Sequence, residues 1–262
     1  MGTLLPDGID VDLWYVRSDE VTDSRLLARY RQLLSADETA QVRQFAFEKG
    51  RHQCLVTRAL ARTVLSHYAG GEPSSLEFAR NAFGKPGLVK PAGLPLSFNL
   101  SHTAGVVACA VASGQEIGVD IEDTNRRLKY LPLARRFFAA AEASAVENEL
   151  PEQRRVTFFR LWTLKEAYIK ARGVGLSIPL DSFAFTLCGD RPPAVCFTGD
   201  CRDEPGSWQF AQIGLDERYR LALAVRLPGG HSPGIRIRQT IPLQQSGAGR
   251  MLPPCPAHEW TV

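Results

Sequence analysis

An acidic pair, Asp120 and Glu122, stands in the middle of the chain. Apolar residues alternate with this pair: Ile117, Val119 and Ile121. A strand through the segment would turn its apolar side chains to one face and both carboxylates to the other. Two oxygen ligands of the kind that Mg²⁺ prefers would then lie side by side. Taken alone, the segment also fits a strand whose acidic face is simply solvated.

A second chemically suggestive segment runs from Trp162 to Lys170. Trp162, Glu166 and Lys170 recur at every fourth position, so a helix would present them on one face. A third carboxylate would then be flanked by an ammonium group one turn away. Proteins usually hold Mg²⁺ with a few carboxylates together with substrate phosphates, and the two segments together favour such a site. By itself, the helix also fits an ordinary solvated face.

Two further motifs precede the acidic pair. One is a Gly-Lys-Pro turn at Gly84–Pro86, and the other is Phe98–His102, which reads Phe-Asn-Leu-Ser-His. With Gly118–Glu122 and Trp162–Ala167, the chain carries four motifs in a defined order. In this order they resemble the Sfp-type (surfactin-type) 4′-phosphopantetheinyl transferases. The resemblance covers roughly residues 35 to 187.

The resemblance implies a reaction. The 4′-phosphopantetheine group of coenzyme A would be transferred to a serine of an apo acyl or peptidyl carrier protein, with release of 3′,5′-ADP. Mg²⁺ is the implied cofactor and coenzyme A the co-substrate. In phosphoryl transfer the protein mainly positions the reactants and stabilises charge, so metal ligands and cations matter most. The sequence does not reveal which carrier or pathway is served.

The motif match assigns three kinds of site residue. The implied magnesium ligands are Asp120, Glu122 and Glu166. The implied catalytic residues are Glu166, Asp120 and Lys170, with Glu166 as the base for the incoming serine. The implied coenzyme A ligands are Arg51, Lys85, Ser101, His102, Lys165 and Lys170.

The chain departs from these relatives where they bind the 3′-phosphate of coenzyme A. Relatives often offer lysines in the helix that opens near Ser35, whereas this chain has Glu38 and Gln41. Arg43 or Arg51 could supply the missing positive charge. How the 3′-phosphate is bound is therefore open.

Two other positions also stay open. Gln53 stands where many relatives have an arginine, which makes Arg51 the first candidate for that role and His52 the second. Glu142 matches a further acidic residue of the family, but an exposed helical glutamate explains it equally well.

We predict an α+β fold. A long helix followed by a strand occurs at Arg154–Ala171 and Phe183–Leu187, and the apolar strand Val106–Ala112 has a counterpart in Leu221–Leu227. The resemblance implies a pseudo-dimer of two similar halves, each a small, mostly antiparallel sheet packed with a long helix. The cofactor cleft would lie between the halves. The predicted division is 1–115, 116–227 and a Pro/Gly-rich extension at 228–262, which we expect to be partly disordered.

Local patterns predict individual elements. Ser35 followed by Glu38 is typical of a capping box that opens a helix. The other expected elements are a strand at Val11–Val16, helices at Asp23–Leu34 and Arg51–Tyr68, one helix within Leu128–Leu150 and a short strand at Ile235–Ile241.

The composition argues against several classes of protein. The 262-residue chain has 44% hydrophobic residues, 23% charged residues and a net charge of +3, which is ordinary for a globular protein. No run of basic residues interleaves with aromatics, which argues against a nucleic-acid partner. No segment approaches the roughly 20 apolar residues that span a bilayer. We expect a cytoplasmic protein without a membrane partner.

Two other functions fit the same residues. One is a coenzyme A or nucleotide-binding module without catalysis, although such a module would not need Asp120, Glu122, Lys165 and Glu166 together. The other is a magnesium-dependent pyrophosphohydrolase, which would consume coenzyme A with no carrier protein present. Because two similar halves in one chain can build the cleft internally, we expect a monomer.

Overall fold

The computed structural model describes residues 5–187, 192–199, 201–227, 229, 232–244, 249–252 and 260–261. The first half contains eight main elements. They are β1 (Val11–Arg17), α1 (Ser24–Leu33), α2 (Ala36–Arg43), α3 (Glu48–Ala69), β2 (Glu77–Arg80), β3 (Pro86–Lys90), β4 (Ser97–Thr103) and β5 (Val106–Ala112). None of the helices in the described ranges is long and apolar enough to cross a membrane.

The second half repeats this order. It contains β6 (Ile117–Asp123), α4 (Tyr130–Phe137), α5 (Ala140–Asn148), α6 (Arg154–Arg172), β7 (Phe183–Thr186), β8 (Ala194–Phe197), β9 (Trp208–Gly214) and β10 (Tyr219–Arg226). In each half an opening strand is followed by two short helices, a long helix, a two-stranded hairpin and two more strands. The sheet orders β1-β5-β4 and β6-β10-β9 correspond, and every pairing within them is antiparallel. The prediction of two similar α+β halves is confirmed.

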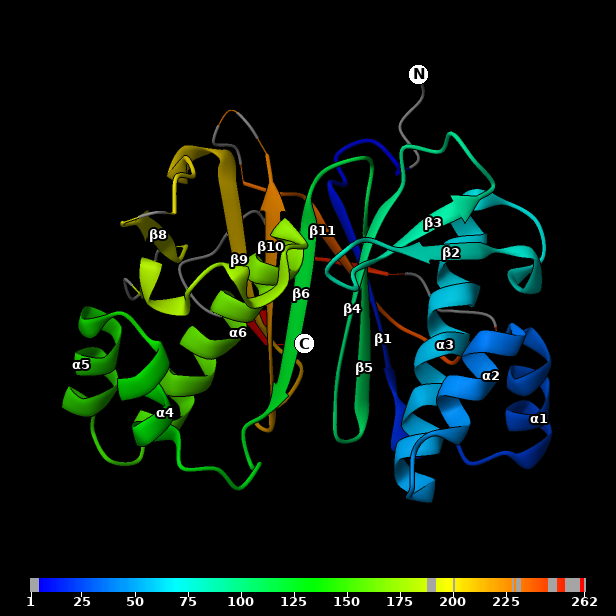
Figure 1. Cartoon of the computed structure of the whole chain (residues 1–262), viewed down its shortest axis with the longest axis horizontal. Coiled ribbons are helices and arrows are strands. Elements are labelled where there is room, and N and C mark those ends of the chain that lie inside the picture. Colours follow the sequence, from blue (N-terminus) through cyan, green and yellow to red (C-terminus); the bar gives the residue numbers. More distant parts are fainter. Residues whose placement is uncertain are drawn as a thin grey trace.

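The molecule has four layers (Figure 1). Helices lie on both outer sides, and the two sheets lie between them. An apolar core fills the space between the sheets, with β1 and β5 contributing from one side and β6, β9 and β10 from the other. A second core lies under α3 and a third under α6. Each sheet is thus apolar on both faces, and this explains why β5 is apolar along its whole length.

The chain beyond the second half returns to both sheets. β11 (Ile235–Gln239) pairs in parallel with β1, β12 (Arg250–Met251) pairs with β11, and β13 (Trp260–Thr261) pairs in parallel with β9. Arg236 and Arg238 of β11 form ion pairs with Asp12, which is fully buried in β1. The predicted short strand near residue 235 is confirmed. The rest of the predicted extension falls partly outside the described residues, at 245–248 and 253–259.

Two local predictions have different outcomes. The capping box at Ser35 is confirmed, because Glu38 donates its backbone N–H to the Ser35 hydroxyl and accepts the N–H of Ser35. The single helix expected within 128–150 is instead two helices, α4 and α5. The break falls at Phe138, whose extended backbone lets its ring pack in the core. The Glu142 carboxylate then accepts the N–H of Ala139 and starts the new helix.

Gly118 determines how closely α6 approaches β6. A Cβ atom at this position would lie 2.0 Å from the carbonyl oxygen of Ala167 and 2.4 Å from the amide nitrogen of Ala171. Both are backbone atoms of α6, so no side-chain adjustment could relieve the overlap. The helix can therefore rest on the strand only where the strand has no side chain.

We predict that Gly118→Ala lowers the free energy of unfolding by at least about 2 kcal/mol, because the helix must move away from the strand. Chemical denaturation followed by circular dichroism would measure this loss. Gly206→Ala is the control, since a Cβ at Gly206 meets nothing within 4 Å. Equal stability of the two variants would contradict the close approach described above.

Candidate functional site

The two halves meet where β4 and β6 run side by side (Figure 1). These strands belong to different sheets and do not pair through their backbones. Instead, side chains at every second position of β4 accept hydrogen bonds from backbone N–H groups at every second position of β6. The three donor–acceptor pairs are Val119 to Asn99 at 2.9 Å, Ile121 to Ser101 at 3.3 Å and Asp123 to Thr103 at 3.3 Å. The polar side chains of β4 therefore fix the register of one half against the other.

This register brings Ser101 against Asp120. The Ser101 hydroxyl donates to Oδ1 of Asp120 at 2.9 Å, and the Lys170 ammonium reaches the same oxygen at 2.6 Å. Lys170 also donates to the Ser101 hydroxyl at 2.8 Å. The other carboxylate oxygen of Asp120, Oδ2, is buried and has no hydrogen-bond partner among the described residues. The structure thus brings two predicted site residues, Ser101 and Lys170, to the carboxylate of a third, Asp120, whose other oxygen is buried and unpaired among the described residues.

The other two predicted metal ligands lie within the electrostatic field of Asp120. Burial and then the negative charge of Asp120 raise the pKa of Glu122 to about 7. The same two causes, in the same order, raise the pKa of Glu166. The alternation predicted for the strand is confirmed, because Ile117 and Ile121 point into the core between the sheets.

The three carboxylates are close but are not arranged around a common ion. Among the described residues, no group of three or more His, Cys, Asp and Glu side chains is placed to hold a metal. Lys170 occupies one oxygen of Asp120, and the Arg126 guanidinium lies 3.3 Å from the Glu122 carboxylate. The shared magnesium site therefore remains a prediction.

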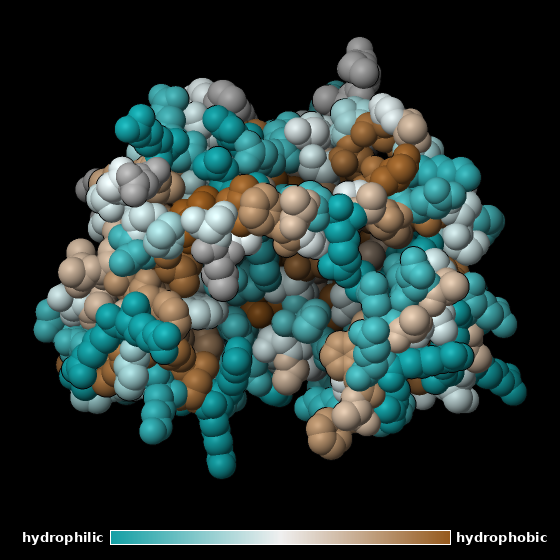
Figure 2. All heavy atoms as spheres, in the orientation of Figure 1, coloured by the Kyte–Doolittle hydropathy of each residue, from teal (hydrophilic) through white to brown (hydrophobic). Residues whose placement is uncertain are grey.

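An open pocket of about 470 Å³ lies beside this cluster. It is lined by Lys49, Gly50, Gln53, His102, Thr103, Ala104, Glu122, Asp123 and Arg126. We call it the central pocket, because both halves contribute to it. Figure 2 shows this face of the molecule, which is hollowed between the two halves. His102 is exposed at the pocket wall, yet crowding of its ring by protein atoms, and then the charge of Lys170, lower its pKa.

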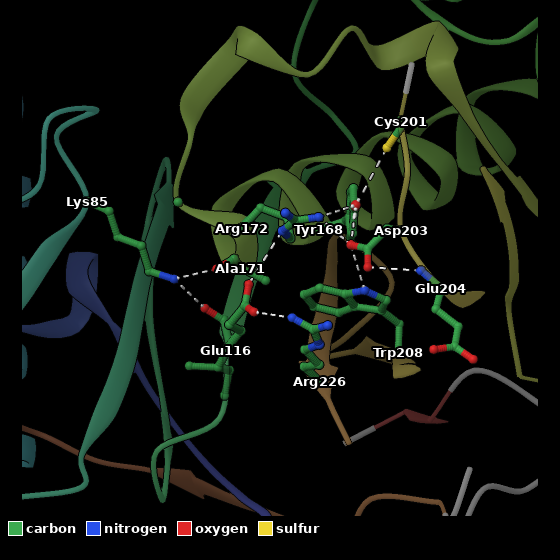
Figure 3. A network of polar contacts seen from close by, with 12 residues as sticks. Lys85, Glu116, Tyr168, Ala171, Arg172, Cys201, Asp203, Glu204, Trp208 and Arg226 are labelled. Carbon is green, nitrogen blue, oxygen red and sulfur yellow. Dashed lines mark hydrogen bonds and ion pairs between the residues drawn. The ribbon is translucent and has the colours of Figure 1, made fainter. Parts of the chain in front are cut away.

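Lys85 lies at the other end of β6 (Figure 3). Its ammonium donates to the carbonyl oxygens of Ile117 at 3.0 Å and Ala171 at 2.8 Å. Burial lowers the pKa of Lys85 to about 8. Ile117 is about 10 Å along the strand from Asp120, so the structure does not bring Lys85 to the carboxylates. Here Lys85 fastens the β2–β3 hairpin to the second half, and its predicted contact with coenzyme A stays a prediction.

The same end of α6 is held by a polar network (Figure 3). Arg172 lies between Glu116 and Asp203 and forms ion pairs with both. Asp203 also accepts hydrogen bonds from the Tyr168 hydroxyl at 2.9 Å and the Trp208 indole at 3.0 Å. These contacts fix the last turn of the helix that carries Lys170.

The structure places Lys165, a predicted coenzyme A ligand, away from the cleft, so its contact with coenzyme A stays a prediction. Lys165 is fully buried on the side of α6 that faces the core, where its ammonium lies 2.6 Å from the Glu142 carboxylate. It also donates to the carbonyl oxygens of Leu180 and Phe183, at 2.7 and 2.6 Å. Consecutive helical residues point about 100° apart, so Lys165 faces the core while Glu166 faces the cleft. Glu142 is accordingly neither an exposed glutamate nor a cleft residue.

Arg51 and its alternatives also lie elsewhere. Arg51 binds the Glu48 carboxylate at 2.9 Å and the carbonyl oxygens of Phe45 and Ala46. Together with Arg43 and His52 it lines a cavity between α1, α2 and α3. That cavity shares no lining residue with the central pocket. The structure therefore does not bring Arg51 to Asp120.

Sequence reasoning missed several residues of the site. Gln53 donates from α3 to the carbonyl oxygens of Thr103 and Val106, at 3.1 and 3.2 Å, and so holds the turn after β4. Asn99 accepts the backbone N–H of Val119 and so helps to position β6. Its place two residues before Ser101, on the same face of a strand, was the pattern from which this role could have been predicted. No pattern in the sequence indicated that Lys49 and Arg126 would share a pocket, because they come from different halves.

We predict that Lys165→Met lowers the free energy of unfolding by about 3–5 kcal/mol, because it leaves the Glu142 carboxylate buried without a counter-ion. Adding Glu142→Gln should restore part of the loss. Lys90→Met is the matched control: the pair of Lys90 with Glu77 is exposed, so its loss should cost less than about 1 kcal/mol. Urea denaturation of the four proteins would measure these values. A stable Lys165→Met variant with weakened coenzyme A binding would contradict the structural role and support the prediction that Lys165 binds coenzyme A.

The comparisons with known proteins agree with this architecture. The profile of the 4′-phosphopantetheinyl transferase superfamily matches residues 116–224, and that of the 4′-phosphopantetheinyl transferase N-terminal region matches residues 22–114. The two matches divide the chain between β5 and β6, where the strand order begins to repeat.

Individual relatives give the same result. The chain is 36% identical over 224 residues to the 4′-phosphopantetheinyl transferase HetI of Nostoc sp. (strain PCC 7120), covering 85% of this chain and 90% of that protein. It is 32% identical over 200 residues to a 4′-phosphopantetheinyl transferase of Bacillus subtilis, covering 76% and 85%. It is 30% identical over 200 residues to the 4′-phosphopantetheinyl transferase Sfp of Bacillus subtilis (strain 168), with the same coverage. The chain therefore belongs to the 4′-phosphopantetheinyl transferase superfamily of enzymes.

Proposed function

We propose that this protein transfers 4′-phosphopantetheine from coenzyme A to a serine of an apo acyl or peptidyl carrier protein and releases 3′,5′-ADP in a Mg²⁺-dependent reaction. The observation that carries the proposal is the gathering of Asp120, Lys170 and Ser101 beside Glu122 and Glu166 at the junction of the halves. Both walls of the central pocket come from one chain, so the site needs no second copy. This supports a monomer.

The residues fit a magnesium ion by their chemistry. Oδ2 of Asp120 is a buried acceptor without a partner among the described residues, and a cation would satisfy it. Burial and then the like charge of Asp120 raise the pKa of both Glu122 and Glu166, and a cation would also relieve the repulsion from Asp120. Asp120, Glu122 and Glu166 would hold the metal. When bound, it would neutralise charge on the pyrophosphate of coenzyme A.

The remaining steps belong to side chains. Lys170 and His102 border the carboxylates and would orient the phosphate that bears pantetheine. Glu166 would accept the proton of the carrier serine. The serine oxygen then bonds to phosphorus as the bond from phosphorus to the oxygen of 3′,5′-ADP breaks. The central pocket offers the serine a route to Glu122 and His102 from solvent.

The two other functions have different products. A pyrophosphohydrolase would consume coenzyme A without a carrier, and a binding module would consume none. Intact-mass analysis of a panel of apo carrier proteins, incubated with enzyme, coenzyme A and Mg²⁺, separates the three. Addition of phosphopantetheine to a carrier would support the proposal, and its absence from every carrier tested would count against it.

We predict that Asp120→Ala and Glu166→Gln each lower the transfer rate by roughly 10²-fold or more, because each removes a preorganised charged group. The thermal midpoint should change little, while the transfer rate falls. The rate, its magnesium dependence and the thermal midpoint would be measured for each variant. Glu152→Gln, at an exposed position, is the matched control. Near wild-type transfer with unchanged magnesium dependence in Asp120→Ala would overturn the proposed metal site.

We also predict that the carrier contacts α4. Arg136 is exposed and lies over the ring of Phe137, whereas Phe138 is buried in the core and Arg135 pairs with Glu147 at 2.5 Å. Arg136→Glu should raise the KM for an acidic carrier, because charge reversal slows encounter, and should leave coenzyme A kinetics unchanged. Arg29→Glu is the matched control, because Arg29 is exposed on α1 and the same change in charge then falls on the other half. Equal carrier kinetics in both variants would remove α4 from the docking surface.

A further inference from the structure

A second cavity of about 520 Å³ lies between α2, α3, β2 and β4. It is lined by Ser35, Asp37, Glu38, Gln41, Arg58, Ala61, Arg62, Leu76, Glu77, Phe78, Arg80, Pro86, Phe98 and Leu100. We call it the α2–α3 cavity. Leu100 and His102 project from the same face of β4, so the cavity lies about 7 Å along the strand from the His102 wall of the central pocket. One elongated ligand could therefore occupy both.

Three arginines line the α2–α3 cavity, and one of them is fully engaged. Arg62 is 2% exposed, lies 2.7 Å from the Glu38 carboxylate and donates to the carbonyl oxygens of Pro73 and Leu76. The positive charge of Arg62 and the negative charge of Glu38 cancel. Glu77 is in turn paired with Lys90 at 3.0 Å. Two of the three carboxylates of the cavity are thus neutralised by other cations, and the third, Asp37, is exposed.

Arg58 has no carboxylate partner among the described residues. Its Nη2 donates to the neutral side-chain oxygen of Gln41 at 2.8 Å, and its Nε is buried with no hydrogen-bond partner in the described part of the chain. Arg80 donates to the carbonyl oxygen of Gly84 at 3.0 Å and is exposed. A guanidinium with a buried, unpaired N–H is suited to a planar or tetrahedral anion, because it offers several donors in one plane. The cavity therefore has unused positive charge on the α3 side.

Arg58 is also electrostatically connected to the catalytic cluster. The pKa of His102 is lowered first by crowding of its ring by protein atoms and then by Lys170, and Arg58 adds to this effect while Asp120 opposes it. Arg58 and Lys170 are thus two cations that act on the same imidazole. Arg43 and Arg51, the two arginines that the sequence suggested for this role, line the separate cavity between α1, α2 and α3.

Resting on the function proposed above, we propose that Arg58, supported by Arg80, binds the 3′-phosphate of coenzyme A in the α2–α3 cavity and thereby selects coenzyme A over its 3′-dephospho form. A phosphomonoester carries about −1.5 to −2 charges near neutrality, more than the single charge on each phosphate of the pyrophosphate. Arg58 takes the place of cations that Glu38 and Gln41 cannot provide. Gln41 orients the guanidinium, while Arg62 neutralises Glu38, which would otherwise repel the phosphate.

The test compares transfer from coenzyme A and from 3′-dephospho-coenzyme A. Arg58→Ala should lower kcat/KM for coenzyme A by about 10- to 100-fold, as expected for lost hydrogen bonds to a charged group, and should leave kcat/KM for the dephospho form unchanged. Arg58→Lys should retain part of the discrimination. Arg43→Ala is the matched control, with the same charge change in the neighbouring cavity, and should keep the wild-type ratio. Calorimetric binding of 3′,5′-ADP and 5′-AMP gives a second readout without transfer.

The possible outcomes are distinct. An unchanged ratio in Arg58→Ala, while the wild type transfers normally, would overturn the role of Arg58 and leave the proposed function intact. An equal loss with both substrates, together with a lowered thermal midpoint, would show that Arg58 is structural and would also overturn it. A wild-type protein that transfers from neither substrate would refute the proposed function and this inference together.

Discussion

The structure depends on the way in which the edge strand of one half meets the edge strand of the other. Backbone N–H groups at a buried edge need partners, and β4 provides them through Asn99, Ser101 and Thr103 instead of through its own backbone. Each of these bonds joins residues twenty positions apart, so all three specify one register. A shift by one residue would place apolar side chains of β4 against the N–H groups of β6. The register of the halves is thus set by the same strand that carries His102.

A second constraint positions the helix against this junction. Because Gly118 has no side chain, α6 can lie directly on β6, and this proximity lets Lys170 reach Asp120 across the strand. The far end of the contact is held by Lys85, which donates to carbonyl oxygens at the start of β6 and the end of α6, and by the Arg172 network. The three carboxylates, Lys170 and His102 therefore stand on β4, β6 and α6, and the contacts just described fix the distances between these elements.

The distribution of charge follows from this packing. On the cleft side of α6, three carboxylates face fewer cations, and burial and then the negative charge of Asp120 raise the pKa of Glu122 and Glu166. On the core side, Lys165 and Glu142 balance one another in a closed pair with backbone partners. The carboxylates on the cleft side thus lack enough positive charge to balance them, whereas the pair on the core side is balanced. A surplus of negative charge beside an unpaired carboxylate oxygen is what distinguishes a binding site from a structural ion pair here.

By itself, the sequence determined features that depend on periodicity along the chain. The alternation at Asp120 and Glu122, the capping box at Ser35 and the duplicated order of helix and strand were all predicted from neighbouring residues, and the structure confirms them. The family was likewise predictable, because it rests on the order of short motifs that local geometry preserves.

Only the tertiary structure decided which of two covered faces each residue occupies. Most of α6 is enclosed, with a core on one side and β6 on the other, so helical spacing alone could not show that Lys165 faces inward while Glu166 and Lys170 face the cleft. The same holds for Arg51 and Arg58, which project from one helix into separate cavities. The parallel pairing of β11 with β1 joins residues more than two hundred positions apart. These arrangements result from packing between segments that are far apart in the sequence, and a local sequence pattern does not show which distant segment will pack against it.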